Sequence, residues 1–115
     1  MINFACNKFD LNEIIKCGLG LTKADFRIMQ FLLKHKDEEF TTEKIAKKLS
    51  INLTTAQRAV KKLHEKEVLS RSQANLEGGG YIYIYQAKGK NAIRKVVREL
   101  IHSWAENAEE VVENW

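Results

Sequence analysis

The hydrophobic repeat of this chain changes near residue 69 from a helical period to a strand-like one, and it returns to a helical period after residue 90. Before residue 69, apolar residues recur every three or four positions, as in helices that bury one side. After it, residues 69–76 and 81–86 read as two strands, and Tyr81–Tyr85 alternates aromatic with β-branched side chains. Gly78, Gly79 and Gly80 tolerate positive φ and predict a hairpin between the strands. The pattern therefore predicts a helical body followed by one β-hairpin.

Capping residues divide the first part of the body. Asp10 is the expected start of a brief helix over residues 11–17, which Gly18 and Gly20 end. Thr22 opens a clearer helix, with Asp25 three residues on as a variant of the capping box. Because the chain contains no proline, glycine and capping residues are the signals that set these boundaries.

Two further helices follow, separated by a tight turn. Thr42 is the expected N-cap of the first, which is short. Residues 50–52 form the turn, and the second helix is predicted over residues 53–67. Its inner face consists of apolar residues at spacings of four and three, with one more alanine beside them: Ala56, Val60, Leu63 and Ala59.

The last segment, residues 91–115, predicts one long helix. Its apolar stripe advances in steps of 4, 3, 4, 4, 3 and 4, an average near 3.67, which keeps the stripe straight along an α-helix. At about 1.5 Å per residue the stripe spans roughly 33 Å, more than the core of a small domain requires. We therefore expect a dimer interface formed by Ile93, Val97, Leu100, Trp104, Ala108, Val111 and Trp115.

Positive charge gathers in the middle of the chain. The net charge is +4; residues 1–40 are balanced, residues 41–71 carry eight basic and three acidic side chains, and residues 91–115 carry three basic and five acidic. This distribution is typical of a protein that meets a polyanion with its central segment. A solvated lysine-rich face is the structural alternative.

The order helix, short helix, turn, helix, hairpin is that of a winged helix-turn-helix, whose second helix enters the major groove of DNA. Glutamine can pair with adenine and arginine with guanine, while lysine and threonine can hold phosphates. Taken singly, such residues are also ordinary surface residues. The predicted DNA-binding residues are Thr42, Asn52, Thr54, Thr55, Gln57, Arg58, Lys61, Lys62 and Arg71.

Residues 21–86 resemble the winged-helix domain of archaeal TrmB-like regulators and, more distantly, that of the MarR group. The resemblance is carried by Leu21-Thr22-Lys23-Ala24-Asp25, by Ile45-Ala46-Lys47-Lys48-Leu49, by residues 54–63 and by residues 79–85. It implies a dimeric transcriptional regulator. Full-length TrmB-like proteins have a large C-terminal sugar-binding domain, whereas this chain ends after one helix, so sugar sensing is not implied and an effector stays open. The hairpin also has Glu77 at its tip and only Arg71 as a basic residue, which leaves its contact with DNA open.

Other classes of protein fit less well. His35, His64 and His102 stand in no catalytic or metal-binding motif, so we expect neither an enzyme nor a cofactor. Cys6 and Cys17 are too few for a zinc site within one chain, although an oxidant-sensitive pair is conceivable. No signal peptide and no membrane-spanning segment is predicted, and we expect a cytoplasmic protein.

We therefore predict a mainly α protein with a small β-hairpin wing: a lead-in helix in residues 1–20, a winged-helix DNA-binding domain in residues 21–88, and a dimerisation helix in residues 89–115. The predicted function is sequence-specific binding of double-stranded DNA by a homodimer that regulates transcription. The alternative is a winged-helix protein-interaction module of a transcription assembly that does not read DNA itself.

Overall fold

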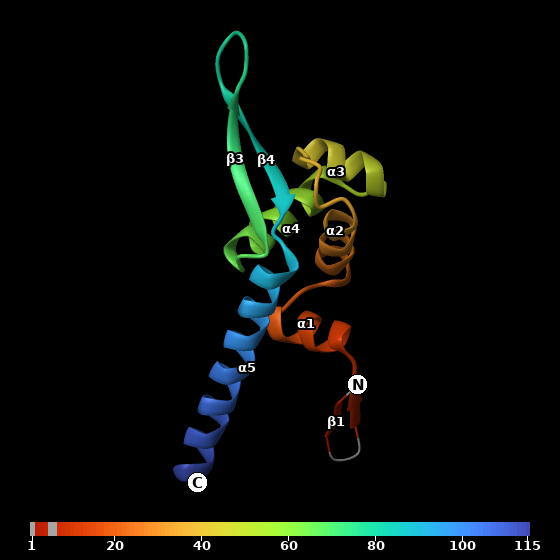
Figure 1. Cartoon of the computed structure of the whole chain (residues 1–115). Helices are drawn as coiled ribbons and strands as arrows, with labels where there is room; N and C mark the ends of the chain where they lie inside the picture. Colours follow the sequence, from red (N-terminus) through yellow and green to blue (C-terminus); the bar gives the residue numbers. More distant parts are fainter. Residues whose placement is uncertain (1, 5–6) are drawn as a thin grey trace.

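The computed structural model describes residues 2–4 and 7–115. Its helical body consists of α1 (Leu11–Leu19), α2 (Lys23–Lys34), α3 (Thr42–Leu49) and α4 (Leu53–Glu65). Strands β3 (Leu69–Asn75) and β4 (Tyr81–Ala87) form the hairpin, and α5 (Lys90–Glu113) follows it (Figure 1). A further antiparallel pair, β1 (Ile2–Phe4) and β2 (Asn7–Phe9), lies at the N-terminus, where the sequence did not predict strands. The predicted fold class, a winged helix-turn-helix with a long last helix, is confirmed.

The N-terminal caps of α1 and α2 match the prediction. The Asp10 carboxylate accepts a hydrogen bond from the Glu13 N–H at 2.8 Å, and Thr22 and Asp25 form a reciprocal capping box. The C-terminal end of α1 differs in part. Gly20 is the left-handed C-cap at φ 66°, whereas Gly18 lies inside the helix.

The predicted cap of α3 is wrong by one residue. The Thr41 hydroxyl, not that of Thr42, accepts the Lys44 N–H at 3.2 Å, and Thr42 is the first helical residue. The cause is the preceding residue: Phe40 exchanges two backbone hydrogen bonds with Tyr85 of β4, at 2.9 and 2.8 Å. This bridge holds the chain extended up to residue 40, so that the helix starts after Thr41.

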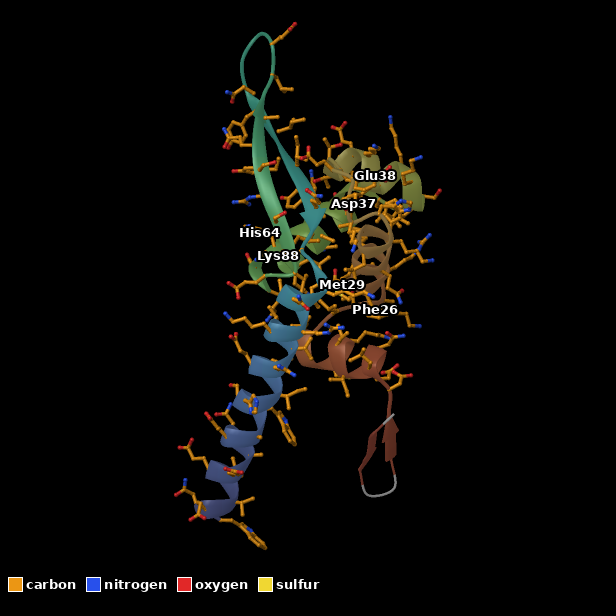
Figure 2. The ribbon with its side chains drawn as sticks, viewed as in Figure 1. Phe26, Met29, Asp37, Glu38, His64 and Lys88 are labelled. Atoms are coloured by element: carbon orange, nitrogen blue, oxygen red, sulfur yellow. The ribbon has the colours of Figure 1, made fainter. Side chains whose placement is uncertain are left out.

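The core lies where α2, α3 and α4 meet the base of the hairpin. Its largest fully buried side chains are Ile28, Leu32, Ile45, Val60, Leu63, Val68 and Leu69. The predicted inner face of α4 is confirmed, since Ala56, Ala59, Val60 and Leu63 are all buried. Figure 2 places Phe26 and Met29 of α2 in the middle of this body. Because α4 buries this inner face, its opposite side is left to solvent.

The hairpin extends from this core as a wing. Its strands pair antiparallel from Leu69 with Ala87 to Asn75 with Tyr81. Gly78, Gly79 and Gly80 have φ of 84°, 105° and 82°, a run that residues with a Cβ adopt only under strain. The base of the wing is buried and its tip is exposed.

Helix α5 begins in the core and leaves it. Ile93 and Val97 are buried within their own chain, Leu100 is half-buried, and the helix then runs on alone (Figure 1). Gly18 of α1 lies so close to Leu100 that a Cβ at position 18 would overlap the leucine. The molecule is elongated as a result, with extents of 61 × 25 × 25 Å. In the described part of the chain, none of the helices combines the length and apolarity needed to span a membrane.

Candidate nucleic-acid interface

The turn between α3 and α4 is fixed by backbone and side-chain hydrogen bonds. Ser50 adopts a left-handed conformation at φ 53°, and the Ile51 N–H donates to the Ala46 carbonyl at 3.0 Å. The Asn52 Oδ1 accepts the Thr54 N–H at 2.7 Å and so caps α4. Asn52 therefore positions the helix through its oxygen, while its exposed amide nitrogen can still donate outward.

Four of the predicted residues share the outward face of α4. Thr54, Gln57, Arg58 and Lys61 are all exposed, and their spacing of three, four and seven places them in one row along the helix. Thr55 is half-buried at the edge of this row. The face thus combines groups that can donate to base edges with groups that can bind phosphates.

Lys62 lies elsewhere, although the sequence placed it in the same outward set. Its Nζ donates to the Asp25 carboxylate at 2.9 Å and to the Gly20 carbonyl at 3.2 Å. It therefore ties α4 to the start of α2 and the end of α1. The two partners are 37 and 42 residues away in sequence, so no local pattern could indicate them.

Asp25 is the buried acid of this arrangement, with a side chain only 7% exposed. Burial by itself acts to raise the pKa of its carboxyl. Hydrogen bonds from the Thr22 backbone, Lys62 and the Thr22 hydroxyl, together with the charge of Lys62, outweigh this effect, so the pKa lies below its usual value. Asp25 is thus ionised at neutral pH and neutralises the charge of Lys62.

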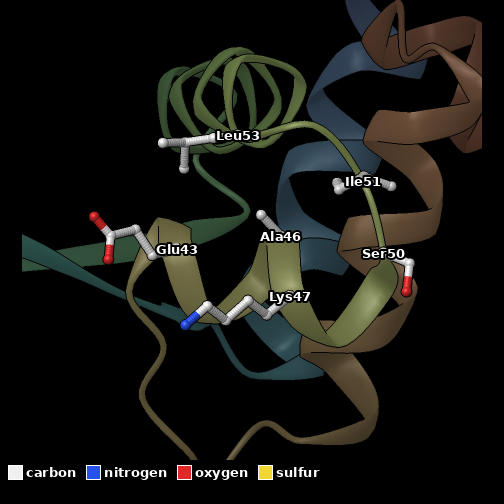
Figure 3. A pocket seen from close by; sticks show the side chains of 6 residues that line it. All are labelled: Glu43, Ala46, Lys47, Ser50, Ile51 and Leu53. Atoms are coloured by element: carbon white, nitrogen blue, oxygen red, sulfur yellow. The ribbon is translucent and has the colours of Figure 1, made fainter.

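A shallow hollow of about 400 Å³ lies between α3 and the start of α4 (Figure 3). Glu43, Lys47 and Leu53 extend to the same side of it. Leu53 is 40% exposed although its spacing from Ala56 assigns it to the inner stripe; as the first residue of α4 it projects past the body. Sequence reasoning missed both Leu53 and the three exposed lysines of α3, Lys44, Lys47 and Lys48. The excess of lysine in residues 41–71 was the signal for the latter.

The wing closes the other side of the interface. A second hollow, of about 300 Å³, separates β4 from α3 and α4, and Thr42, Gln57 and Tyr83 are among its lining residues. Thr42 is half-buried there. The Arg71 guanidinium stacks 4.2 Å from the centre of the Tyr83 ring, which holds this wing cation beside the hollow. A hydrogen bond with Tyr83 raises the pKa of Tyr81, so the Tyr81 phenol stays neutral at physiological pH.

The predicted dimer residues divide into three groups by their burial within the single chain. Ile93 and Val97 pack in their own core, and Leu100 and Ala108 are half-buried. Trp104, Val111 and Trp115 are exposed by 67%, 71% and 104%. The predicted cysteine pair is not placed, since Cys17 is exposed on α1 but Cys6 lies outside the described residues.

Comparison with known proteins gives this geometry a context. A model of the DnaD N-terminal domain family matches residues 9–108. A possible transcriptional regulator from Methanosarcina mazei Go1 is 46% identical, and the match covers 100% of this chain and 96% of that one with a TM-score of 0.89. An uncharacterized protein of Methanocaldococcus jannaschii is 25% identical over 98% of this chain and 84% of its own length. A mutant of Staphylococcus aureus MepR bound to an oligodeoxyribonucleotide is 16% identical, with 90% and 76% coverage and a TM-score of 0.52, which shows a shared fold.

Proposed function

The chain belongs to the DnaD N-terminal domain family, and from its winged-helix fold and the outer face of α4 we propose that it binds double-stranded DNA sequence-specifically and regulates transcription. Membership of this family does not by itself establish that the chain reads a DNA sequence. The proposal therefore depends on the chemistry of the exposed side chains.

The observation that supports it best is the row Thr54, Gln57, Arg58 and Lys61 on the free side of α4. A helix presented in this way fits the major groove of B-DNA. Gln57 has the donor and acceptor needed for adenine, and Arg58 has the paired donors needed for guanine. Thr54 and Lys61 stand at either end of the row, where they can fix the helix on phosphates.

The surroundings of α4 favour a polyanion. Lys44, Lys47 and Lys48 of α3 and Arg71 of the wing are exposed around the row, and they can contact the phosphate backbone on both sides of the groove. Thr42, in the first turn of α3, carries a backbone N–H of the kind that binds phosphate at helix N-termini. In this arrangement the wing would contact DNA through Arg71, not through its tip.

The relatives support the same class of function. The Methanosarcina mazei relative is itself a possible transcriptional regulator, and the MepR variant of the same fold is seen with an oligodeoxyribonucleotide. The resemblance of residues 21–86 to short TrmB-like and MarR-like regulators is part of this proposal. We also propose that the protein acts in the cytoplasm, where the DNA of an archaeal cell lies.

We infer that the active form is a homodimer held by α5. One winged helix covers few base pairs, and two of them related by a two-fold axis can read two half-sites about one helical turn apart. The exposed Trp104, Val111 and Trp115 supply an apolar face that a single chain leaves uncovered.

Selection of bound sequences from random duplex DNA tests the proposal. We expect an inverted repeat, and we expect binding to weaken steeply as salt increases. The double variant Gln57→Ala/Arg58→Ala should lose the selected sequence while retaining salt-dependent binding to random duplex. If the wild-type protein shows no salt-dependent binding to any duplex, the proposal is wrong and a protein-interaction module is the better interpretation.

A further inference from the structure

A groove lies between α1, the end of α2 and the first half of α5, with a volume of about 400 Å³. Its apolar lining consists of Leu11, Ile15, Leu33, Ile93 and Val97, and Leu11 is 64% exposed. Its other lining residues are all cationic: Lys36, Lys88, Lys90, Arg94 and Arg98. Figure 2 shows Lys88 where the wing joins α5. Among the described residues that line it none is acidic, so the groove fits an apolar ligand that carries negative charge.

Helix α5 has opposite charges in its two halves. Residues 90–101 contain four basic side chains and one acidic, whereas residues 102–115 contain four acidic side chains and none that is lysine or arginine. The acidic half also carries the large exposed apolar residues Trp104, Val111, Val112 and Trp115. This distal half is therefore an apolar segment with negative charge, which is the chemistry that the groove fits.

We propose that the distal half of α5 from a second copy of the chain docks in this groove, so that the two α5 helices run antiparallel and each copy fills the groove of the other. The inference rests on the proposed function in one respect, since it takes the homodimer as the active form and specifies its orientation and register. A two-fold axis makes the contact reciprocal, as a closed dimer requires.

The orientation follows from charge. In a parallel pair, the basic halves would lie together and the acidic halves would lie together, and both contacts would repel. In the antiparallel pair, Arg94 and Arg98 lie near Glu109 and Glu110 of the other copy. Such surface pairs add little affinity but they discriminate between alternative arrangements. The affinity comes from covering the apolar residues of the groove and of the distal half.

The register follows from position along the helix. The part of α5 that lines the groove, Ile93 to Arg98, is centred between residues 95 and 96, and the exposed apolar segment 104–115 is centred near residue 110. Their antiparallel alignment puts the two-fold axis close to residue 102 or 103, just beyond the contact of Leu100 with α1 and next to the exposed Trp104. A chain cannot satisfy its own groove, because the same straight helix forms the groove wall at one end and the docking segment at the other.

Charge reversal in the full chain tests the contact, with the dimer dissociation constant measured by sedimentation equilibrium. We expect Arg94→Glu/Arg98→Glu, and separately Glu109→Arg/Glu110→Arg, to weaken the dimer at least tenfold. The chain that carries all four changes should dimerise again within threefold of the wild type, because the exchanged charges remain complementary. Lys95→Glu is the matched control, since Lys95 is exposed on the same helix but does not line the groove; we expect less than a twofold change.

Disulfide trapping tests the geometry in a Cys6→Ser/Cys17→Ser background. A chain with both Leu11→Cys and Val112→Cys should form covalent dimers on mild oxidation, and neither single variant should. Cross-linking of the Val112→Cys chain alone would indicate a parallel pair and would overturn the proposal, since in the antiparallel pair the two residues 112 are about 30 Å apart.

The remaining outcomes separate this inference from the proposed function. If charge reversal leaves the dimer unchanged and the double-cysteine chain stays monomeric under denaturing conditions, while the wild type binds DNA as a dimer, the docking is wrong and the function stands. If the docking results are as expected but duplex DNA is not bound, the function is wrong and the docking stands. Far-ultraviolet circular dichroism of each variant identifies any that fails to fold, and the four-change chain keeps the test decisive in that case.

Discussion

Adjacent lysines of α4 should have different roles, and replacing each by alanine separates them. Lys61 lies exposed in the outward row of α4, while Lys62 donates to the buried Asp25 carboxylate at 2.9 Å and to the Gly20 carbonyl at 3.2 Å. The two substitutions remove the same side chain from neighbouring positions of one helix. Each is therefore the control for the other.

The expected magnitudes differ in kind. Lys62→Ala removes a charge-assisted hydrogen bond, for which about 1.5–3 kcal/mol is usual, but the lysine is 37% exposed and Asp25 keeps its bonds to Thr22. We expect a loss of about 1–2 kcal/mol in the free energy of unfolding, or roughly 4–8 °C in the melting temperature of a chain this size. Lys61→Ala should change stability by less than about 0.5 kcal/mol.

For DNA binding, the effect of Lys61→Ala should be larger than that of Lys62→Ala. If Lys61 contacts one phosphate in each subunit, its removal makes the negative slope of log K against log salt less steep by about 1.8 per dimer. Raising salt from 50 to 200 mM would then cost the variant about 12-fold less affinity than it costs the wild type. Lys61→Arg keeps the charge and should keep the slope.

Fluorescence anisotropy titrations at several salt concentrations and thermal melts measure both quantities on the same samples. The reasoning would be refuted if Lys62→Ala lowered the salt slope as much as Lys61→Ala does while melting at the wild-type temperature. It would also be refuted if neither variant changed the slope.

Three further predictions concern other parts of the molecule. Gln57→Ala and Arg58→Ala should each cost about 1–3 kcal/mol in binding to the selected DNA and relax the preference at one base pair, with unchanged melting; early melting with normal binding would contradict their placement on the outer face. Asp25→Asn should lower the free energy of unfolding by about 1–2 kcal/mol at pH 7. Because the folded-state pKa of Asp25 is lowered, that difference is fully present above the unfolded value near 3.9 and should vanish as pH falls through the folded value, which denaturant titrations from pH 7 down to pH 2 would measure. Ending the chain before Trp104 should give monomers or aggregates with much weaker DNA affinity, and a stable dimer in sedimentation with native affinity would place the interface elsewhere.

Local signals in the sequence were enough for much of the fold. The spacing of Ala56, Val60 and Leu63 defines both faces of α4, and the alternation of Tyr81–Tyr85 with the glycines before it defines the wing. The same spacing located the outward row Thr54, Gln57, Arg58 and Lys61. These features depend on neighbours within about one helical turn or one hairpin, which a sequence displays directly.

The predictions that were wrong concern residues whose positions depend on contacts with elements distant in the sequence. Lys62 lies on the flank of the apolar stripe, and whether that flank meets solvent or another helix depends on where α2 packs. The choice of Thr41 over Thr42 as cap depends on the bridge from Phe40 to the wing. The cationic groove joins residues from α1, α2 and α5 with Lys36 and Lys88 from the segments beside them, and no local pattern relates them.

The length of α5 also makes the spacing between two DNA-reading helices a mechanical quantity. At 24 residues the helix measures about 36 Å, and it meets α1 at the close contact of Gly18 with Leu100. A tilt of about 10° about that contact, which lies about 20 Å from the end of α5, displaces this end by roughly 3.5 Å, which is about one base-pair step along DNA. The contact of Gly18 with Leu100 is thus the point about which α5 would tilt, and a Cβ added at this glycine would have to displace the Leu100 side chain. The spacer length that a dimer prefers between its half-sites would then report the angle between α5 and the winged-helix body. That length can be determined from the bound DNA sequences alone.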